Sequence, residues 1–208
     1  MRQSCHRCLR PVERCLCSDL PELPSRTRVV IVQHPREARL AICSAWLARI
    51  ALQNAELHQA VDLDTHRRVE EVCADPGAAL LFPGPGAVPA GLWSGALPSL
   101  LLVIDGTWHQ AERMVARSRL VQRLPRLAVA SDGAAGYGEL RREPGEDTLS
   151  TVEAIALALS ALEGEPARFE PMRAAFRRMV ELQLECARGP ARSPRHRPSR
   201  AARAPRRR

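Results

Sequence analysis

Aromatic side chains are scarce in this sequence. Phe, Trp and Tyr make up 3% of the 208 residues, so the chain lacks the broad base-stacking platform that single-strand nucleic-acid binders use. The share of apolar residues is nonetheless 45%, which is ordinary for a packed globular protein. Leu, Val, Ile and Ala must therefore fill the core of one sizeable domain.

Long apolar runs are also missing. No uninterrupted run approaches the ~18 residues that a membrane-spanning helix needs, and the N-terminal stretch "MRQSCHRCLR" lacks the apolar segment of a secretory signal. We therefore expect a cytoplasmic protein with no membrane partner. In a reducing compartment the seven cysteines are not expected to form a disulfide framework, so a tight Cys cluster needs another explanation.

Lysine is absent, so all 31 basic residues are arginines, against 23 acidic residues. Nine of these arginines lie in residues 188–208, which contain no acidic residue, whereas residues 1–187 are nearly neutral. We expect this tail to be disordered, because it has little to bury and its charges repel one another. It either holds a polyanion by counterion release or is a dispensable extension whose Arg richness reflects coding bias.

Short apolar runs alternate with segments of helical period through the rest of the chain. The runs lie at 29–32, 57–61, 79–82, 100–104 and 127–130, and the periodic segments at 37–53, 107–119, 150–162 and 170–187. This alternation predicts an α/β domain with a mostly parallel, buried sheet. One face of the last segment carries four large apolar side chains, Met172, Phe176, Met179 and Val180. Two long Gly- and Pro-rich connections, "FPGPGAVPAG" and "SDGAAGYGELRREPGED", are either surface loops or parts of a binding site.

The first 27 residues form a Cys-, Pro- and Arg-rich head without a helical or strand period. Its cysteines follow the spacing C-x2-C-x6-C-x-C and are Cys5, Cys8, Cys15 and Cys17. Because so small a segment cannot bury a core of its own, four thiolates around a structural Zn²⁺ would supply its folding energy. Chance clustering, or His6 in place of one thiolate, is the alternative. The remaining cysteines are interpreted as core thiols: Cys43, Cys73 and Cys186.

The stretch "DGTWHQ" at 105–110 follows one of the apolar runs. Thr107 and Gln110 have the spacing of a capping box, which satisfies exposed backbone donors where a helix begins. Asp105 then lies at the carboxyl end of a strand, the edge of an open parallel sheet where ligands bind. It is either a functional acid in a crevice or a second cap. Trp108 is interpreted as a plug in the core.

A second capping box opens the helical segment that begins near residue 150. Ser150 and Glu153 have its spacing, and the free amides of the first helical turn would suit an anion such as a carboxylate. Glu153 is interpreted as part of the cap, with a general base as the alternative.

Several separated blocks of the sequence resemble the DTW-domain family of tRNA-uridine aminocarboxypropyltransferases. They are the Cys head, "VVIVQHPREA" at 29–38, "LLFPGPG" at 80–86, "LLVIDGTWHQAERM" at 101–114, "LPRL" at 124–127 and "LSTVEAIALAL" at 149–159. The resemblance implies a SPOUT-like α/β fold with a knot in its C-terminal part, an exception to the rule against threaded chains. It also implies transfer of the 3-amino-3-carboxypropyl group of S-adenosylmethionine to N3 of a tRNA uridine, with release of methylthioadenosine.

The resemblance also implies roles for individual residues. Asp105 would be the catalytic base, or would orient the uridine imide, because N3 becomes nucleophilic only when its proton is removed or shared. Ser150 and Thr151, with their helix amides, would hold the donor's carboxylate. The full set of expected donor contacts is Phe82, Pro83, Gly84, Pro85, Gly86, Leu127, Leu149, Ser150 and Thr151. Arg141 and Arg142, together with the head and the tail, would meet tRNA phosphates.

This interpretation divides the chain into a zinc-binding head at 1–27, a catalytic domain at 28–187 and the tail at 188–208. Glu139 departs from it, because a basic residue is expected at that position. Two rivals remain: a SPOUT-like RNA methyltransferase with the same donor, and a noncatalytic RNA-binding module. The sequence leaves open whether the protein is a monomer or a homodimer.

Overall fold

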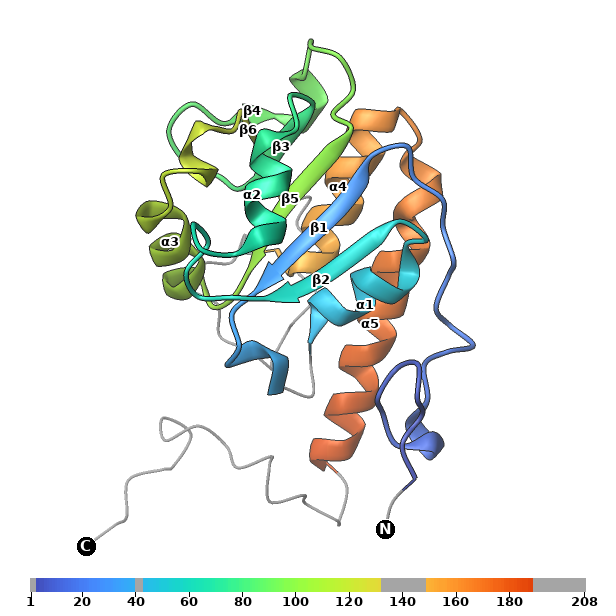
Figure 1. Cartoon of the computed structure of the whole chain (residues 1–208). Coiled ribbons are helices and arrows are strands. Elements are labelled where there is room, and N and C mark those ends of the chain that lie inside the picture. Colours follow the sequence, from blue (N-terminus) through green and yellow to red (C-terminus); the bar gives the residue numbers. More distant parts are fainter. Residues whose placement is uncertain (1–2, 40–42, 132–148, 189–208) are drawn as a thin grey trace, which may run out of the picture.

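The computed structural model describes residues 3–39, 43–131 and 149–188, and its centre is one parallel sheet (Figure 1). The strand order is β2-β1-β5-β3-β6-β4, and every neighbouring pair is parallel. The strands are β1 (Arg28–Gln33), β2 (Ala55–Gln59), β3 (Ala78–Leu81), β4 (Val88–Pro89), β5 (Leu100–Asp105) and β6 (Arg126–Ala128). The α-helices are α1 (Ser44–Ala51), α2 (Arg67–Ala74), α3 (Trp108–Arg117), α4 (Thr151–Glu163) and α5 (Pro166–Arg188). The predicted α/β class and parallel sheet are confirmed.

Helices cover both faces of the sheet, and each face has its own core (Figure 1). Successive strand residues point to opposite faces, so Val29 and Ile31 pack with α1, α4 and α5, whereas Val30 and Val32 pack with α2 and α3. Central strands that are buried on both sides need apolar residues at every position. This is why β3 and β5 appear in the sequence as unbroken apolar runs.

The last helix buries the face that its periodicity predicts. Met172, Phe176, Met179 and Val180 are all at most 6% exposed. The helix begins at Pro166 rather than near residue 170, since proline is well tolerated in a first helical turn. Gly164, with a φ of 70°, separates it from α4.

Three elements differ from the sequence prediction. The segment 37–53 is not one helix: a short 3-10 turn covers Glu37–Arg39, and α1 begins only at Ser44. Helix α2 and the two-residue strand β4 were not expected. Both are short, and α2 buries only Val69 and Val72, which is too little periodicity to be recognised in the sequence.

The Cys-rich head packs directly against the main domain. Leu16 and Leu20 belong to the same core as α1 and α5. The indole nitrogen of Trp46 on α1 donates to the carbonyl of Arg7 at 3.1 Å, and Arg14 forms an ion pair with Glu185 at 2.8 Å. The head is therefore joined to the sheet domain by apolar and polar contacts.

Some expectations lie outside the described residues. Arg141 and Arg142 lie in residues 132–148, which lead from β6 to α4, and the expected knot also depends on this segment. The tail beyond Arg188 is the other part concerned. In the part of the chain that the structure covers, no helix is both long enough and apolar enough to span a membrane.

Candidate active site

The carboxyl ends of β1 and β5 bring two polar side chains together. Gln33 and Asp105 are the last residues of these strands and are paired in register. Both occupy odd positions, so they lie on the face of the sheet that α4 covers, as Val103 does. Carboxyl ends of neighbouring parallel strands are where open α/β sheets bind ligands.

Asp105 is held by side chains from two other elements. The amide nitrogen Nε2 of Gln33 donates to Oδ2 of Asp105 at 2.7 Å, and the hydroxyl of Thr151 at the start of α4 donates to Oδ1. The residue is 7% exposed. Its carboxylate is thus buried, with each oxygen accepting a hydrogen bond from a neutral donor, and its orientation is fixed.

Thr107, and not Asp105, caps α3. The Thr107 hydroxyl accepts from the amide of Gln110 at 3.3 Å, and the Gln110 side chain accepts from the amide of Thr107 at 2.8 Å. The predicted capping box is therefore confirmed. Gly106 fits closely beside it, because a Cβ there would lie 3.1 Å from Cβ of Gln110 and one of the two would have to shift. Asp105 is left facing the pocket described below.

The second capping box is also confirmed. Ser150 caps α4, and its amide and hydroxyl both donate to Oε2 of Glu153, at 3.0 and 2.6 Å. Glu153 is 1% exposed, so the structure favours its role in the cap over that of a general base. The start of α4 therefore holds two buried carboxylates, that of Glu153 and, through Thr151, that of Asp105.

Most of the predicted site residues line one small pocket. Its volume is about 120 Å³. The predicted residues that line it are Phe82, Pro83, Asp105, Leu149, Ser150 and Thr151. Three of these follow or end strands and three precede or begin α4, so the site depends on the sheet and the helix being docked together.

A larger pocket of about 600 Å³ adjoins the first. Phe82, Pro83 and Trp108 line both pockets, and Gly84 and Pro85 line the larger one. The rings of Phe82 and Trp108 are stacked, with centroids 5.6 Å apart and planes 12° from parallel. Trp108 is 40% exposed, so the interpretation of this residue as a core plug was wrong.

Two expected donor contacts lie away from these pockets. Leu127 is fully buried in the core of the domain. Its neighbour in the sequence, Arg126, lines the larger pocket instead. Gly86 has a φ of 76°, which favours glycine, and lines neither of the two pockets. The positive φ explains why glycine occupies this position in the loop.

Sequence reasoning gave Gln33 no role. Its side chain is 1% exposed and reaches both Asp105 and the sulfur of Cys43, at 3.0 Å. Cys43 is half-buried, and burial raises the pKa of its thiol. The available signal was a glutamine directly after four apolar residues of a buried strand. A polar group there needs a buried partner.

The four cysteines of the head form one cluster. Their sulfurs all lie within 4.8 Å of one another, with Cys5 and Cys17 at 3.5 Å and Cys8 and Cys15 at 3.7 Å. Sulfurs bound to a tetrahedral Zn²⁺ at about 2.3 Å would lie roughly 3.8 Å apart, so the set fits such an ion. His6 is exposed and is not part of the cluster.

The thiols of the cluster differ in their pKa values. Backbone amides of Cys8 and Arg7 lower the pKa of the Cys5 thiol to about 6, whereas burial raises the pKa of Cys17 to about 12. Without a positive charge the four thiols would not all be ionised at neutral pH. A bound metal ion would keep all four thiols in the deprotonated, thiolate form.

Comparisons with known proteins identify the family of the chain. The DTW domain matches residues 2–184. The chain is 30% identical to tRNA-uridine aminocarboxypropyltransferase 2 of Drosophila melanogaster, over 88% of this chain and 76% of that protein. It is 30% identical to the Mus musculus protein of the same name, over 88% and 64%, and 28% identical to tRNA-uridine aminocarboxypropyltransferase A of Arabidopsis thaliana, over 88% and 81%. No solved structure gives a significant match. The chain belongs to the DTW domain family.

Proposed function

We propose that this protein transfers the 3-amino-3-carboxypropyl group of S-adenosylmethionine to N3 of a uridine in tRNA. The names of its relatives supply the reaction class. The observation that carries the proposal is the meeting of Asp105, Thr151 and the Phe82–Pro83 turn in one pocket at the carboxyl edge of a parallel sheet. In the reaction a C–N bond forms at N3, the C–S bond of the donor breaks, and its electron pair stays on the sulfur of methylthioadenosine.

Asp105 is the proposed base, or the group that orients the uridine imide. Uridine N3 carries a proton that must be removed or shared before the nitrogen can attack, and a positioned carboxylate can accept it. Such assistance typically contributes roughly 10²- to 10⁴-fold in rate. Gln33 and Thr151 fix both carboxylate oxygens, and this supports a role in which the position of the oxygen matters. The leaving sulfur becomes neutral as the bond breaks and needs no acid.

The donor would span both pockets. The smaller one is well below the roughly 300–1,000 Å³ of a pocket for a whole ligand, so it suits only the amino-acid end. The adenosine would then lie in the larger pocket, against the Gly84–Pro85 loop and Arg126. The donor's sulfonium and ammonium groups are positive, and the carboxylate of Asp105 supplies matching negative charge in the lining of the smaller pocket.

The start of α4 remains the proposed contact for the donor's carboxylate. The hydroxyls of Ser150 and Thr151 are already bonded, to Glu153 and Asp105. The backbone amide of Glu153 donates to the Ser150 hydroxyl, so the amides of Thr151 and Val152, which have no partner within the helix, are the better candidates. Leu149 and Pro83 would cover the apolar carbons of the donor's aminocarboxypropyl group.

Zinc is the proposed ion for the head. Cys5, Cys8, Cys15 and Cys17 would hold it, and it would supply stability to the segment rather than chemistry to the reaction. Cysteines that are not joined in disulfides are typical of proteins in a reducing compartment. This supports a cytoplasmic location. The SPOUT-like knot, and phosphate contacts by Arg141, Arg142 and the tail, belong to the same proposal.

The test is mass spectrometry of nucleosides from bulk tRNA incubated with the protein and S-adenosylmethionine. We expect uridine to gain the aminocarboxypropyl mass as methylthioadenosine appears. A methyl gain with adenosylhomocysteine would instead identify a methyltransferase. An unchanged nucleoside pool, with tRNA bound, would favour a noncatalytic RNA-binding module.

A further inference from the structure

Two sets of arginines in the described part of the chain differ in their partners. Ten of those in the described part of the chain form ion pairs with glutamates: Arg7, Arg14, Arg26, Arg28, Arg67, Arg68, Arg168, Arg173, Arg177 and Arg178. These pairs lie on the head, on β1 and β2, and on α2 and α5. Their charges are balanced within the protein, so the fold accounts for them without a partner.

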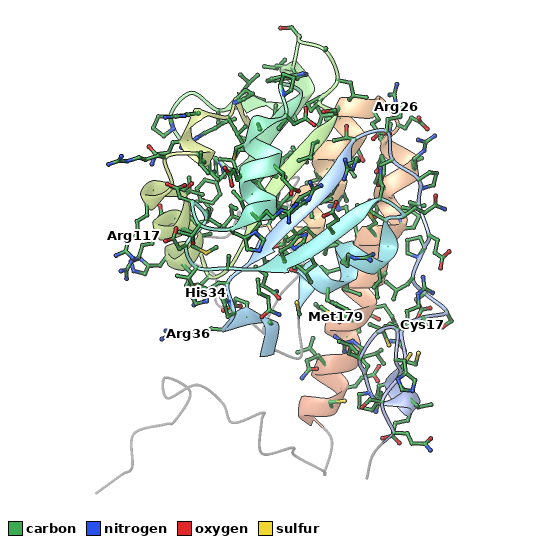
Figure 2. The ribbon with its side chains drawn as sticks, viewed as in Figure 1. Cys17, Arg26, His34, Arg36, Arg117 and Met179 are labelled. Atoms are coloured by element: carbon green, nitrogen blue, oxygen red, sulfur yellow. The ribbon has the colours of Figure 1, made fainter. Side chains whose placement is uncertain are left out.

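The second group lies between α3 and β6. We call Arg113, Arg117, Arg123 and Arg126 the arginine face. Residues 108–126 contain a single acidic residue, Glu112, and among the described residues none of the four guanidinium groups takes part in an ion pair. Arg113, Arg117 and Arg123 are exposed, and Figure 2 shows Arg117 projecting from α3 into solvent.

Folding does not explain this arrangement. Arg113 and Arg117 are four residues apart on α3, a spacing at which like charges repel and weaken a helix. Arg117 lies in the last turn, where the helix dipole favours a cation, but Arg113 gains nothing from it. An anionic partner would remove the repulsion.

The arginine face borders the larger pocket. Arg113 and Arg126 line it, and so does the partly exposed ring of Trp108. The adenosine proposed for this pocket carries no negative charge, so it gives these guanidinium groups nothing to bind. Arginines beside an exposed aromatic ring are, however, the combination that holds unpaired nucleotides.

We propose that the arginine face binds the sugar-phosphate backbone of the acceptor RNA next to the target nucleotide. This inference rests on the proposed function for the identity of the RNA, and it assigns the docking surface to residues 113–126. Arg117 and Arg123 contact phosphates outside the pocket, while Arg113 and Arg126 contact them at its rim. The backbone then crosses the pocket mouth, where a flipped base can reach Asp105.

The test compares two double variants of the full-length protein that remove the same charge. Arg117→Gln/Arg123→Gln removes half of the arginine face, and Arg177→Gln/Arg178→Gln removes two paired arginines of α5. Binding of unmodified tRNA is measured without S-adenosylmethionine over a range of salt concentrations. Circular dichroism melting curves check that both variants are folded.

We expect the first variant to bind tRNA about ten-fold more weakly, with a salt slope smaller by roughly 1.4 to 1.8, as the loss of two phosphate contacts requires. Its KM for tRNA should rise while its KM for S-adenosylmethionine and its kcat at saturating tRNA stay unchanged. The α5 variant should bind as the wild type does. Equal affinities and slopes for the two variants would overturn the inference. It would also be overturned if the Arg117→Gln/Arg123→Gln variant lost binding to phosphatidylserine vesicles while its tRNA binding stayed intact.

The same experiment separates this inference from the proposed function. If the wild type binds tRNA through the arginine face but leaves its uridines unmodified, the inference stands and the function fails. If the first variant modifies tRNA with wild-type kcat/KM, the function stands and the inference fails.

Discussion

Gln33 and Asp105 end adjacent parallel strands, and the Gln33 amide donates a 2.7 Å hydrogen bond to the Asp105 carboxylate. The two residues are 72 positions apart in the sequence. Their contact makes Gln33 a positioning residue for the proposed base. It also ties the geometry of the site to the register of β1 and β5.

Replacing Gln33 should slow the reaction without weakening donor binding. In Gln33→Ala, Oδ2 of Asp105 loses its donor and the carboxylate can turn, so we expect kcat to fall about 10- to 100-fold with little change in KM for S-adenosylmethionine. Gln33→Glu should be at least as slow, because two carboxylates would then face each other. Steady-state kinetics measure both effects.

Cys43→Ala is the matched control for Gln33. It removes the other partner of the same amide, at 3.0 Å, but leaves the bond to Asp105 in place. We expect kcat to stay within about two-fold of the wild type. An equal loss in Cys43→Ala and Gln33→Ala would show that Gln33 acts through packing alone.

Thr151 should matter through its hydroxyl. Thr151→Val keeps the shape of the side chain but leaves Oδ1 of Asp105 without this donor, and a lost partner of a buried carboxylate costs about 1–3 kcal/mol. We expect lower thermal stability and a fall in kcat, whereas Thr151→Ser should retain most of both. Thermal unfolding and turnover are measured on the same preparations. Similar behaviour of the Val and Ser variants would contradict this role.

Removal of the metal should loosen the head. Elemental analysis is expected to give one zinc per chain, and Cys8→Ser to give less. Because Leu16 and Leu20 pack in the main core, chelation should also lower the melting temperature of the whole domain. A zinc-free protein that melts at the same temperature would exclude a structural ion in this cluster.

Glu56 should make stability depend on pH in the acidic range. The hydrogen bond from Arg68 lowers the pKa of Glu56 from its usual 4.5 to about 2, with smaller contributions from His58 and Arg28. Because the folded state binds the proton more weakly than the unfolded chain, this stabilisation is complete above pH 4.5 and is lost as the pH falls toward 2. The difference in unfolding free energy between the wild type and Glu56→Gln should therefore shrink across this interval. A difference that stays constant would contradict the assignment.

Local features of the site were predictable from the sequence. Thr107 with Gln110, and Ser150 with Glu153, are capping pairs three residues apart, and such a pair depends only on the helix that it begins. The parallel sheet was predictable for a similar reason, because two-sided burial leaves unbroken apolar runs. The tight sulfur cluster likewise follows from short spacings within the head.

Long-range features were not predictable. The bond between Gln33 and Asp105 requires the strand order, and that between Thr151 and Asp105 joins residues 46 positions apart. The exposure of Trp108 depends on the Phe82 loop reaching it from another strand. The arginine face is recognisable only from the folded structure, which shows ten other arginines paired with glutamates.

The central claim is that the carboxylate of Asp105 activates the uridine. Its most direct test is the single-turnover rate of nucleoside formation by Asp105→Asn and Asp105→Ala with tRNA and S-adenosylmethionine both saturating. We predict that both variants fold and bind both substrates, and that the rate falls roughly 10²- to 10⁴-fold. A rate within a few-fold of the wild type in either folded variant would contradict the account.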